Sequence, residues 1–241
     1  MANTIAIIPA RSGSKGVIDK NIKLLAGRPL LAYSILAARL IDDIDRIIVC
    51  TDSEQYADIA RRYGAEVPFL RPVKISSDVS SDYEFIKYAL DWMKENEGYQ
   101  PEYLVHLRPT TPLRNPKYID AAIEQMKQDG RATALRSVHE MPESTYKTFE
   151  IENGFLKCVC TGSWDIEAAG YARQKYKKTY EGNGYVDIIK SSYVLENCKI
   201  HGDRVIAYVT PRIFEADTIE CFDYLEYQVT KDPMLVKRLF K

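Results

Sequence analysis

The stretch Ile5-Ala6-Ile7-Ile8-Pro9-Ala10-Arg11-Ser12-Gly13-Ser14-Lys15-Gly16 joins a short apolar run to a polar loop that contains two cations. An apolar run of this length, followed by a glycine-containing loop, is typical of a buried parallel strand. In open α/β sheets, ligands bind at the edge where such strands end. Gly13 and Gly16 let the backbone approach a phosphate, and successive N–H groups can form an anion-binding nest. Arg11 and Lys15 add positive charge, so the stretch predicts an α/β fold with an anion site after its first strand.

The loop by itself does not identify the ligand. The spacing of a Walker phosphate-binding loop is absent, and a single Gly-x-x-Gly pattern fits an ordinary polar turn equally well.

Apolar runs and amphipathic segments alternate through the first 140 residues. We expect strands at 5–8, 47–50, 103–107 and 133–138, and helices near 30–40, 53–63, 81–93 and 115–130. Ser53, the Ser81–Glu84 capping box and Asn115 are the expected helix starts. The alternation predicts a doubly wound, mostly parallel, Rossmann-like sheet with right-handed crossovers.

The pattern changes between residues 141 and 180. Two strand-like runs, 147–151 and 155–159, flank Glu152-Asn153-Gly154, which is a strong hairpin signal. We therefore expect a single domain over residues 1–241 with an inserted antiparallel arm at about 141–180. Arms of this kind serve oligomerisation or lie over a site. Residues 186–189 and 204–209 resume strand character, and residues 219–240 are expected to be helical.

Bulk composition excludes several classes of function. The chain has 241 residues and a formal charge of −1, which gives no electrostatic basis for a nucleic-acid or membrane-surface partner. No apolar run approaches the roughly 20 residues needed to span a bilayer, and no signal peptide is expected. The five cysteines lack the spacing of a disulfide framework or a zinc site. These features predict a cytoplasmic protein with reduced thiols.

A wider set of motifs is far more specific than the first loop. It comprises residues 9–16, Lys20-Asn21-Ile22, Gly27-Arg28-Pro29-Leu30, Arg71-Pro72, Ser77-Asp78, residues 109–114, Arg173-Gln174, Asn183-Gly184 and Glu215-Ala216-Asp217-Thr218. In this order the motifs resemble the acylneuraminate cytidylyltransferases, the CMP-sialic acid synthetases and their relatives. The resemblance spans nearly the whole chain. It implies a nucleotidyltransferase that couples CMP from CTP to a nonulosonic or related 2-keto sugar acid and releases pyrophosphate.

The resemblance also implies roles for individual residues. The nucleotide would be bound by Ala10, Arg11, Ser14, Lys15, Asn21, Arg71 and Ser80. Arg11, Lys15, Lys20 and Asp217 would carry the chemistry, with Lys20 near the α-phosphate or the leaving pyrophosphate. Asp217 and Glu215 would bind Mg²⁺, because hard divalent ions prefer carboxylate oxygens and residues two apart on an extended segment share a face. A homodimer is implied as well, since the family exchanges its hairpin arm between subunits.

The acceptor side departs from the family pattern. Sialate enzymes usually carry Gln where this chain has Arg108, and the usual Asn-Gly-Ala-Ile-Tyr segment reads Asn183-Gly184-Tyr185-Val186-Asp187 here. A guanidinium at position 108 can form a bidentate pair with a carboxylate. The expected acceptor-binding residues are Arg108, Thr110, Lys147, Arg173 and Asn183. Cytidylyl transfer is therefore better supported than any one sugar acid.

Other interpretations remain open at this point. Asp217 on its own fits the N-cap of the last helix, Arg71 and Arg114 fit surface arginines, and Lys147 and Arg173 fit a solvated hairpin face. The rival functions are a nucleotidyltransferase of the same fold with another nucleotide or a phosphonate or phosphorylated acceptor, and a non-catalytic subunit that binds sugar nucleotides.

Overall fold

The molecule is built on a six-stranded sheet, described in a computed structural model over residues 4–240. The strand order is β10-β6-β9-β5-β1-β4. These strands are β1 (Thr4–Pro9), β4 (Arg46–Cys50), β5 (Tyr103–His106), β6 (Ala134–Glu140), β9 (Tyr180–Lys190) and β10 (Val205–Val209). All pairs are parallel except the two made by β9, which runs antiparallel to both β5 and β6. The doubly wound, mostly parallel sheet predicted from the sequence is confirmed.

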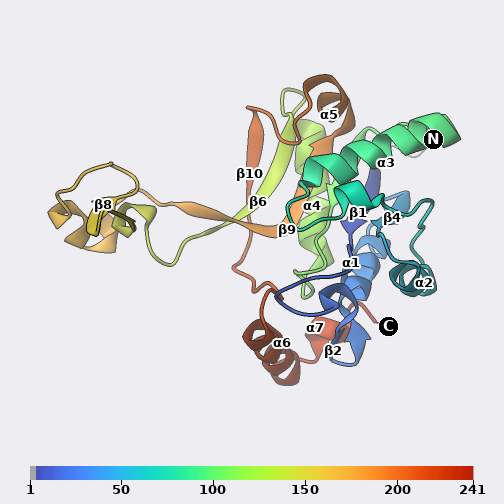
Figure 1. Ribbon diagram of the computed structural model, residues 1–241, viewed down its shortest axis with the longest axis horizontal. Helices are drawn as coiled ribbons and strands as arrows, with labels where there is room; N and C mark the ends of the chain where they lie inside the picture. Colours follow the sequence, from blue (N-terminus) through green and yellow to red (C-terminus); the bar gives the residue numbers. More distant parts are fainter. Residues whose placement is uncertain (1–3, 241) are drawn as a thin grey trace.

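Helices cover both faces of this sheet (Figure 1). They are α1 (Leu30–Arg39), α2 (Glu54–Arg62), α3 (Asp82–Glu97), α4 (Pro116–Gln128), α5 (Ser191–Asn197), α6 (Ile219–Lys231) and α7 (Met234–Lys237). Side chains of β1 alternate between the two cores: Ala6 and Ile8 pack with α1, α2 and α4, whereas Ile5 and Ile7 pack with α3 and α5. An alternation of this kind is what a strand covered on both sides requires.

Local capping signals predicted the helix ends well. The Ser53 hydroxyl accepts from Tyr56 N–H, and Asn115 accepts from Lys117 N–H. Both halves of the Ser81–Glu84 capping box form at the start of α3. The predicted helix at 219–240 is interrupted, because α6 ends at Lys231 and Pro233 precedes the short α7.

A long insertion in the chain separates β6 from β9, which are neighbours in the sheet. Beyond the body, β6 and β9 continue as a ribbon that leads to residues 141–179, which we call the arm (Figure 1). The arm holds the predicted hairpin of β7 (Phe149–Glu152) and β8 (Phe155–Cys158). Asn153 and Gly154 both have positive φ, 52° and 83°, as a tight two-residue turn demands.

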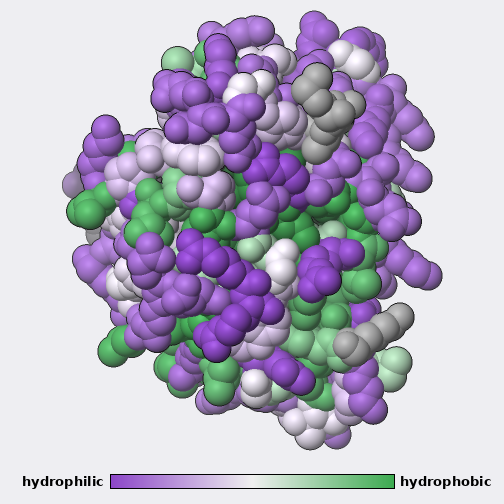
Figure 2. Space-filling model, turned by 90° about the vertical axis from the view of Figure 1, so that its right-hand side faces the viewer, coloured by the Kyte–Doolittle hydropathy of each residue, from purple (hydrophilic) through white to green (hydrophobic). Residues whose placement is uncertain are grey.

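The surface opposite the arm mixes hydrophilic residues with patches of hydrophobic ones (Figure 2). In the part of the chain that the structure describes, every helix is too short or too polar to cross a bilayer.

A fully buried arginine ties the sheet edge together. The Arg114 guanidinium donates to the carbonyls of Tyr185 (2.6 Å), Gly184 (3.0 Å), Arg108 (2.5 Å) and Thr111, and to the Ser34 hydroxyl (2.9 Å). The alternative of a surface arginine is wrong for this residue. Burial lowers the pKa of Arg114 to about 9, which still leaves it charged at neutral pH.

We expect Arg114→Met to lower the free energy of unfolding by about 3–5 kcal/mol, because several buried acceptors would lose their charged donor. Urea denaturation followed by circular dichroism measures this loss. Arg131→Met is the matched control, since the Arg131 side chain is 82% exposed. A loss at position 114 no larger than in the control would contradict a structural role.

Candidate functional site

A cavity of about 450 Å³ opens where β1 and β5 end. Strands β4 and β5 lie on opposite sides of β1, so the strand order reverses there, and open α/β sheets bind ligands at such a switch point. The cavity is lined by Pro9, Arg11, Ser14, Lys15, Gly16, Lys20, Asn21, Arg71, Asp78, Ser80, Asp82, Phe85, Arg108, Pro109 and Thr110. Nine of the residues predicted from the sequence are among them: Arg11, Ser14, Lys15, Lys20, Asn21, Arg71, Ser80, Arg108 and Thr110.

The loop after β1 is held by neighbours rather than by its own backbone alone. The Asp52 carboxylate accepts from Ser12 N–H at 2.7 Å and from the Ser12 hydroxyl at 3.0 Å. Asn21 Nδ2 donates to the Arg11 carbonyl at 2.9 Å. Gly13 has a φ of 68°, a conformation that favours glycine. These bonds hold the loop in an open curve around the cavity.

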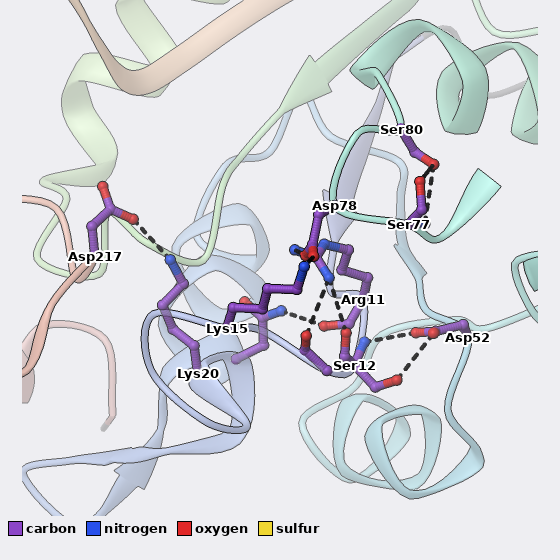
Figure 3. A network of polar contacts seen from close by, with 11 residues as sticks. Arg11, Ser12, Lys15, Lys20, Asp52, Ser77, Asp78, Ser80 and Asp217 are labelled. Carbon is purple, nitrogen blue, oxygen red and sulfur yellow. Dashed lines mark hydrogen bonds and ion pairs between the residues drawn. The ribbon is translucent and has the colours of Figure 1, made fainter.

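The cations of this loop pair with carboxylates from distant parts of the chain (Figure 3). Asp78 contacts both Arg11 Nη2 and Lys15 Nζ, each at 2.5 Å. Lys20 Nζ lies 2.8 Å from Asp217 Oδ1. Arg11, Lys15 and Lys20 therefore converge on one region, as a site for a polyanion requires.

Glu215 and Asp217 lie on the segment before α6, next to the cavity wall. Glu215 Oε2 accepts from the Thr110 hydroxyl at 3.4 Å. Burial, with the charge of Asp217, raises the pKa of Glu215. The N-cap of α6 is Thr218, whose side chain accepts from Cys221 N–H, so the alternative role of Asp217 as a cap is wrong.

These two carboxylates suit a hard divalent cation. The Asp217 side chain is 57% exposed and so accessible to a ligand. Residues 4–240 hold no group of three or more His, Cys, Asp or Glu side chains that could bind a metal. A cation at this place would therefore need oxygens from the substrate and from water to complete its coordination.

Arg108 also lines the cavity, where it lies between two carboxylates. Its Nη2 is 2.7 Å from Asp82 and its Nη1 is 2.9 Å from Asp187. Burial alone would lower the pKa of Arg108, but Asp187 and Asp82 outweigh burial and raise it. Burial would likewise raise the pKa of Asp187, which His201 and Arg108 instead hold well below its usual range. Within the chain, Arg108 thus gives one nitrogen to each of two carboxylates, and a bidentate pair with a single carboxylate stays a prediction.

Arg71 is buried, with only 5% of its surface exposed, so its interpretation as a surface residue is wrong. Its Nε donates to the Ile75 carbonyl at 2.5 Å, and its guanidinium lies 5.1 Å from the centre of the Phe85 ring. Burial lowers the pKa of Arg71. Ser80, on the same side of the cavity, pairs with the Ser77 hydroxyl at 2.9 Å.

The remaining predicted site residues lie outside the cavity lining. Ala10 is fully buried behind the loop. Asn183 is also buried, and its amide is engaged by Thr210 at 2.7 Å and by Tyr185 N–H at 3.2 Å. Lys147 and Arg173 lie in the arm, where Arg173 pairs with Glu140 at 2.9 Å. Within one chain the arm extends away from the cavity (Figure 1).

Sequence reasoning assigned no role to three carboxylates of the site. Asp78 was only part of a motif, Asp187 stood in a segment that departs from the family pattern, and Asp82 carried no signal beyond its place in the first turn of α3. Each pairs with an arginine far away in the chain; Arg11 and Asp78, for example, are 67 residues apart. No local pattern encodes such a pairing.

Comparison with known proteins defines the class. A family model described as cytidylyltransferase matches residues 5–157, which is more than half of the chain. The chain therefore belongs to the cytidylyltransferase family, a class of nucleotidyltransferases.

Curated relatives narrow this class. An N-acylneuraminate cytidylyltransferase from Escherichia coli O18:K1:H7 is 33% identical over 220 residues, which are 91% of this chain and 50% of that protein. A CMP-N,N'-diacetyllegionaminic acid synthase from Legionella pneumophila is 31% identical over 216 residues, 90% of each protein. The chain thus spans half the length of the first relative and nearly all of the second. The resemblance to the acylneuraminate cytidylyltransferases is confirmed.

A solved structure supports the fold. The CMP:2-keto-3-deoxy-manno-octonic acid synthetase complexed with CTP matches with a TM-score of 0.69 at 12% identity, covering 95% of this chain and 99% of that one. At this identity the match speaks for the fold alone.

Gly184 packs between Glu215, Thr111 and Arg108. Its φ is 57°, and a Cβ there would lie 3.1 Å from Glu215 Oε1 and 3.3 Å from Thr111 Oγ1. We expect Gly184→Ala to lower the free energy of unfolding by about 1–3 kcal/mol, through backbone strain and this crowding. Thermal denaturation measures the effect. Gly130→Ala is the control, because a Cβ there meets nothing within 4 Å; equal stability of the two variants would contradict the crowding.

Proposed function

We propose that this chain is a Mg²⁺-dependent cytidylyltransferase that couples CMP from CTP to the anomeric hydroxyl of a nonulosonic or related 2-keto sugar acid. The observation that carries the proposal is the convergence of Arg11, Lys15 and Lys20 on one cavity in a member of the cytidylyltransferase family. The names of the two curated relatives support a sialic-acid-like acceptor. A cytoplasmic location is part of the same proposal.

The reaction is a direct displacement at the α-phosphorus. The acceptor hydroxyl oxygen forms the new P–O bond and loses its proton to solvent, as the bond between the α-phosphorus and the pyrophosphate oxygen breaks. Arg11, Lys15 and Lys20 bind the triphosphate and offset the charge that develops on the departing pyrophosphate. Arg71 and Ser80 contact the nucleoside, with Ala10 supporting the loop from behind, while Ser14 and Asn21 shape the loop around the phosphates. Holding both substrates in line supplies a large part of the rate enhancement.

Asp217 and Glu215 are the residues that would hold Mg²⁺. Lys20 pairs with Asp217 at 2.8 Å, so a cation at Asp217 would leave Lys20 available to the phosphates. Bound Mg²⁺ supplies Lewis-acid polarisation of phosphate oxygens.

The acceptor lies, in this proposal, at the end of the cavity formed by Arg108 and Thr110, with Asn183 supporting it from behind. Arg108 is already paired with both Asp82 and Asp187, so the three side chains together carry a net negative charge and Arg108 is not a free cation. Recognition there depends on hydrogen bonding to hydroxyl or amide groups more than on attraction of the acceptor carboxylate.

A homodimer is also proposed, with the arm as its contact. Phe149, Ile151 and Leu156 lie on one face of the β7–β8 hairpin and are 39%, 78% and 43% exposed. Exposed apolar faces on a projecting hairpin mark contact surfaces. In the dimer, Lys147 and Arg173 would reach the partner's acceptor site, from which they are remote within one chain.

The first test is pyrophosphate release with CTP and Mg²⁺ against a panel of acceptors: N-acetylneuraminate, legionaminate, pseudaminate, 3-deoxy-octulosonate with its 8-amino form, and small phosphonates. We expect release with at least one of the sugar acids. Release with a phosphonate alone, or with another nucleotide in place of CTP, would favour the rival transferase. CTP binding with no release throughout would favour a non-catalytic subunit.

Asp217→Asn tests the metal assignment within the same assay. Turnover should fall by at least about 100-fold, because a ligand of the charge-stabilising ion is lost, while the circular dichroism spectrum stays unchanged. Asp223→Asn, an exposed carboxylate on α6, is the control. Near-normal turnover of Asp217→Asn would remove the assignment.

The dimer is tested by Ile151→Glu, which places a charge on the exposed apolar face. Light scattering after size exclusion should give twice the mass of one chain for the wild type and a lower mass for the variant. Met234→Glu on α7, also at an exposed position, should leave the mass unchanged. A monomeric wild type would sink this part of the proposal.

A further inference from the structure

One carboxylate, that of Asp78, forms ion pairs with two of the cations expected to bind phosphate. Asp78 Oδ1 lies 2.5 Å from Arg11 Nη2, and Asp78 Oδ2 lies 2.5 Å from Lys15 Nζ (Figure 3). Each oxygen of the carboxylate thus takes one cation, as two oxygens of a phosphate group would. A phosphate and Asp78 cannot both pair with these groups in this way.

Asp78 comes from an exposed loop rather than from a rigid element. The loop, residues 76–81, links a short 3₁₀ turn (Val73–Ile75) to α3. The Asp78 side chain is 32% exposed and Val79 is 91% exposed. The bonds inside the loop are local, between Ser77 and Ser80. Withdrawal of Asp78 therefore disrupts no core packing.

The pairs themselves add little to the stability of the fold. Lys15 is 84% exposed and the partners are solvated, a setting in which ion pairs contribute weakly to folding. The hydrogen bond from Lys15, and then that from Arg11, lowers the pKa of Asp78, so the carboxylate is charged at neutral pH. An anion that is charged, exposed and placed against phosphate-binding cations has its main effect on ligand affinity.

We propose that Asp78 is a competing anion for the phosphate cradle, displaced when nucleotide binds and returning to Arg11 and Lys15 as pyrophosphate leaves. The inference rests on the proposed function for its ligand, a nucleoside triphosphate. Asp78 lowers the affinity of the cradle for polyphosphate and so keeps the product from remaining bound. It is a residue of product release and makes no bond to the reacting atoms.

Asp78→Asn tests the proposal, because it keeps the shape of the side chain and removes the charge. Calorimetry with inorganic pyrophosphate and tripolyphosphate should show binding about 3- to 10-fold tighter than in the wild type, as expected for loss of two exposed competing pairs. Inhibition by added pyrophosphate should strengthen in proportion. Asp91→Asn is the control, because Asp91 pairs with Lys87 on α3, outside the cavity lining. The affinity of this variant for pyrophosphate and tripolyphosphate should equal that of the wild type.

The direction of the change separates competition from a structural role. If Asp78 served to shape the loop, its loss would weaken binding, and equal or weaker polyphosphate binding by Asp78→Asn would overturn the proposal. The polyphosphate probes lack cytosine, so the comparison stands apart from the nucleotide assignment. A wild type that binds tripolyphosphate but not CTP would refute the proposed function while the Asp78 comparison still decides this inference.

Discussion

The buried guanidinium of Arg114 is the interaction on which the site depends. It reaches three segments that are distant in the chain: the loop after β5, the middle of β9, and α1 through Ser34. Backbone carbonyls at a sheet edge need donors, and a single planar cation with five N–H groups supplies them to several at once. The backbone positions of Arg108 and Gly184 follow from this arrangement. The part of the cavity lined by Arg108 is therefore set by a residue that does not line it.

Charge matching is the second constraint. Arg11 and Lys15 pair with Asp78, Lys20 pairs with Asp217, and Arg108 pairs with Asp82 and Asp187. Without these carboxylates, the cations that line the cavity would repel one another and destabilise the loop after β1. Internal carboxylates relieve that repulsion until an anionic ligand arrives. The exposed pairs can exchange partners readily, whereas the pair with buried Asp187 cannot, since breaking it would leave a buried carboxylate without its arginine partner.

Local features of the fold were predictable from the sequence, and long-range ones were not. Ser53, the Ser81–Glu84 box and the Asn153–Gly154 turn act on residues within a few positions, so their signals are complete in a short stretch. The antiparallel insertion of β9 between β5 and β6 depends on pairing across the whole sheet, and nothing in residues 180–190 states a direction. For the same reason, the motifs identified the cations that line the cavity but left their carboxylate partners unassigned. For Asn183 the family motif predicted a binding role, but in the fold its side-chain amide is already bonded to Thr210 and Tyr185.

The two departures from the family pattern on the acceptor side explain one another. Arg108 stands where Gln is usual and Asp187 where Tyr is usual, and in the fold the two side chains are 2.9 Å apart. Either change alone would be costly, because Asp187 is 1% exposed and would be a buried charge without Arg108. Asp187 thus accounts for the presence of an arginine at position 108 without any appeal to the acceptor carboxylate. Asp82, the second partner of Arg108, and the paired guanidinium both line the cavity, where they form a surface that can donate and accept hydrogen bonds. That surface differs in kind from the amide of a glutamine, so under the proposed function the departure would affect the choice of sugar acid, while the loop after β1 keeps the family pattern.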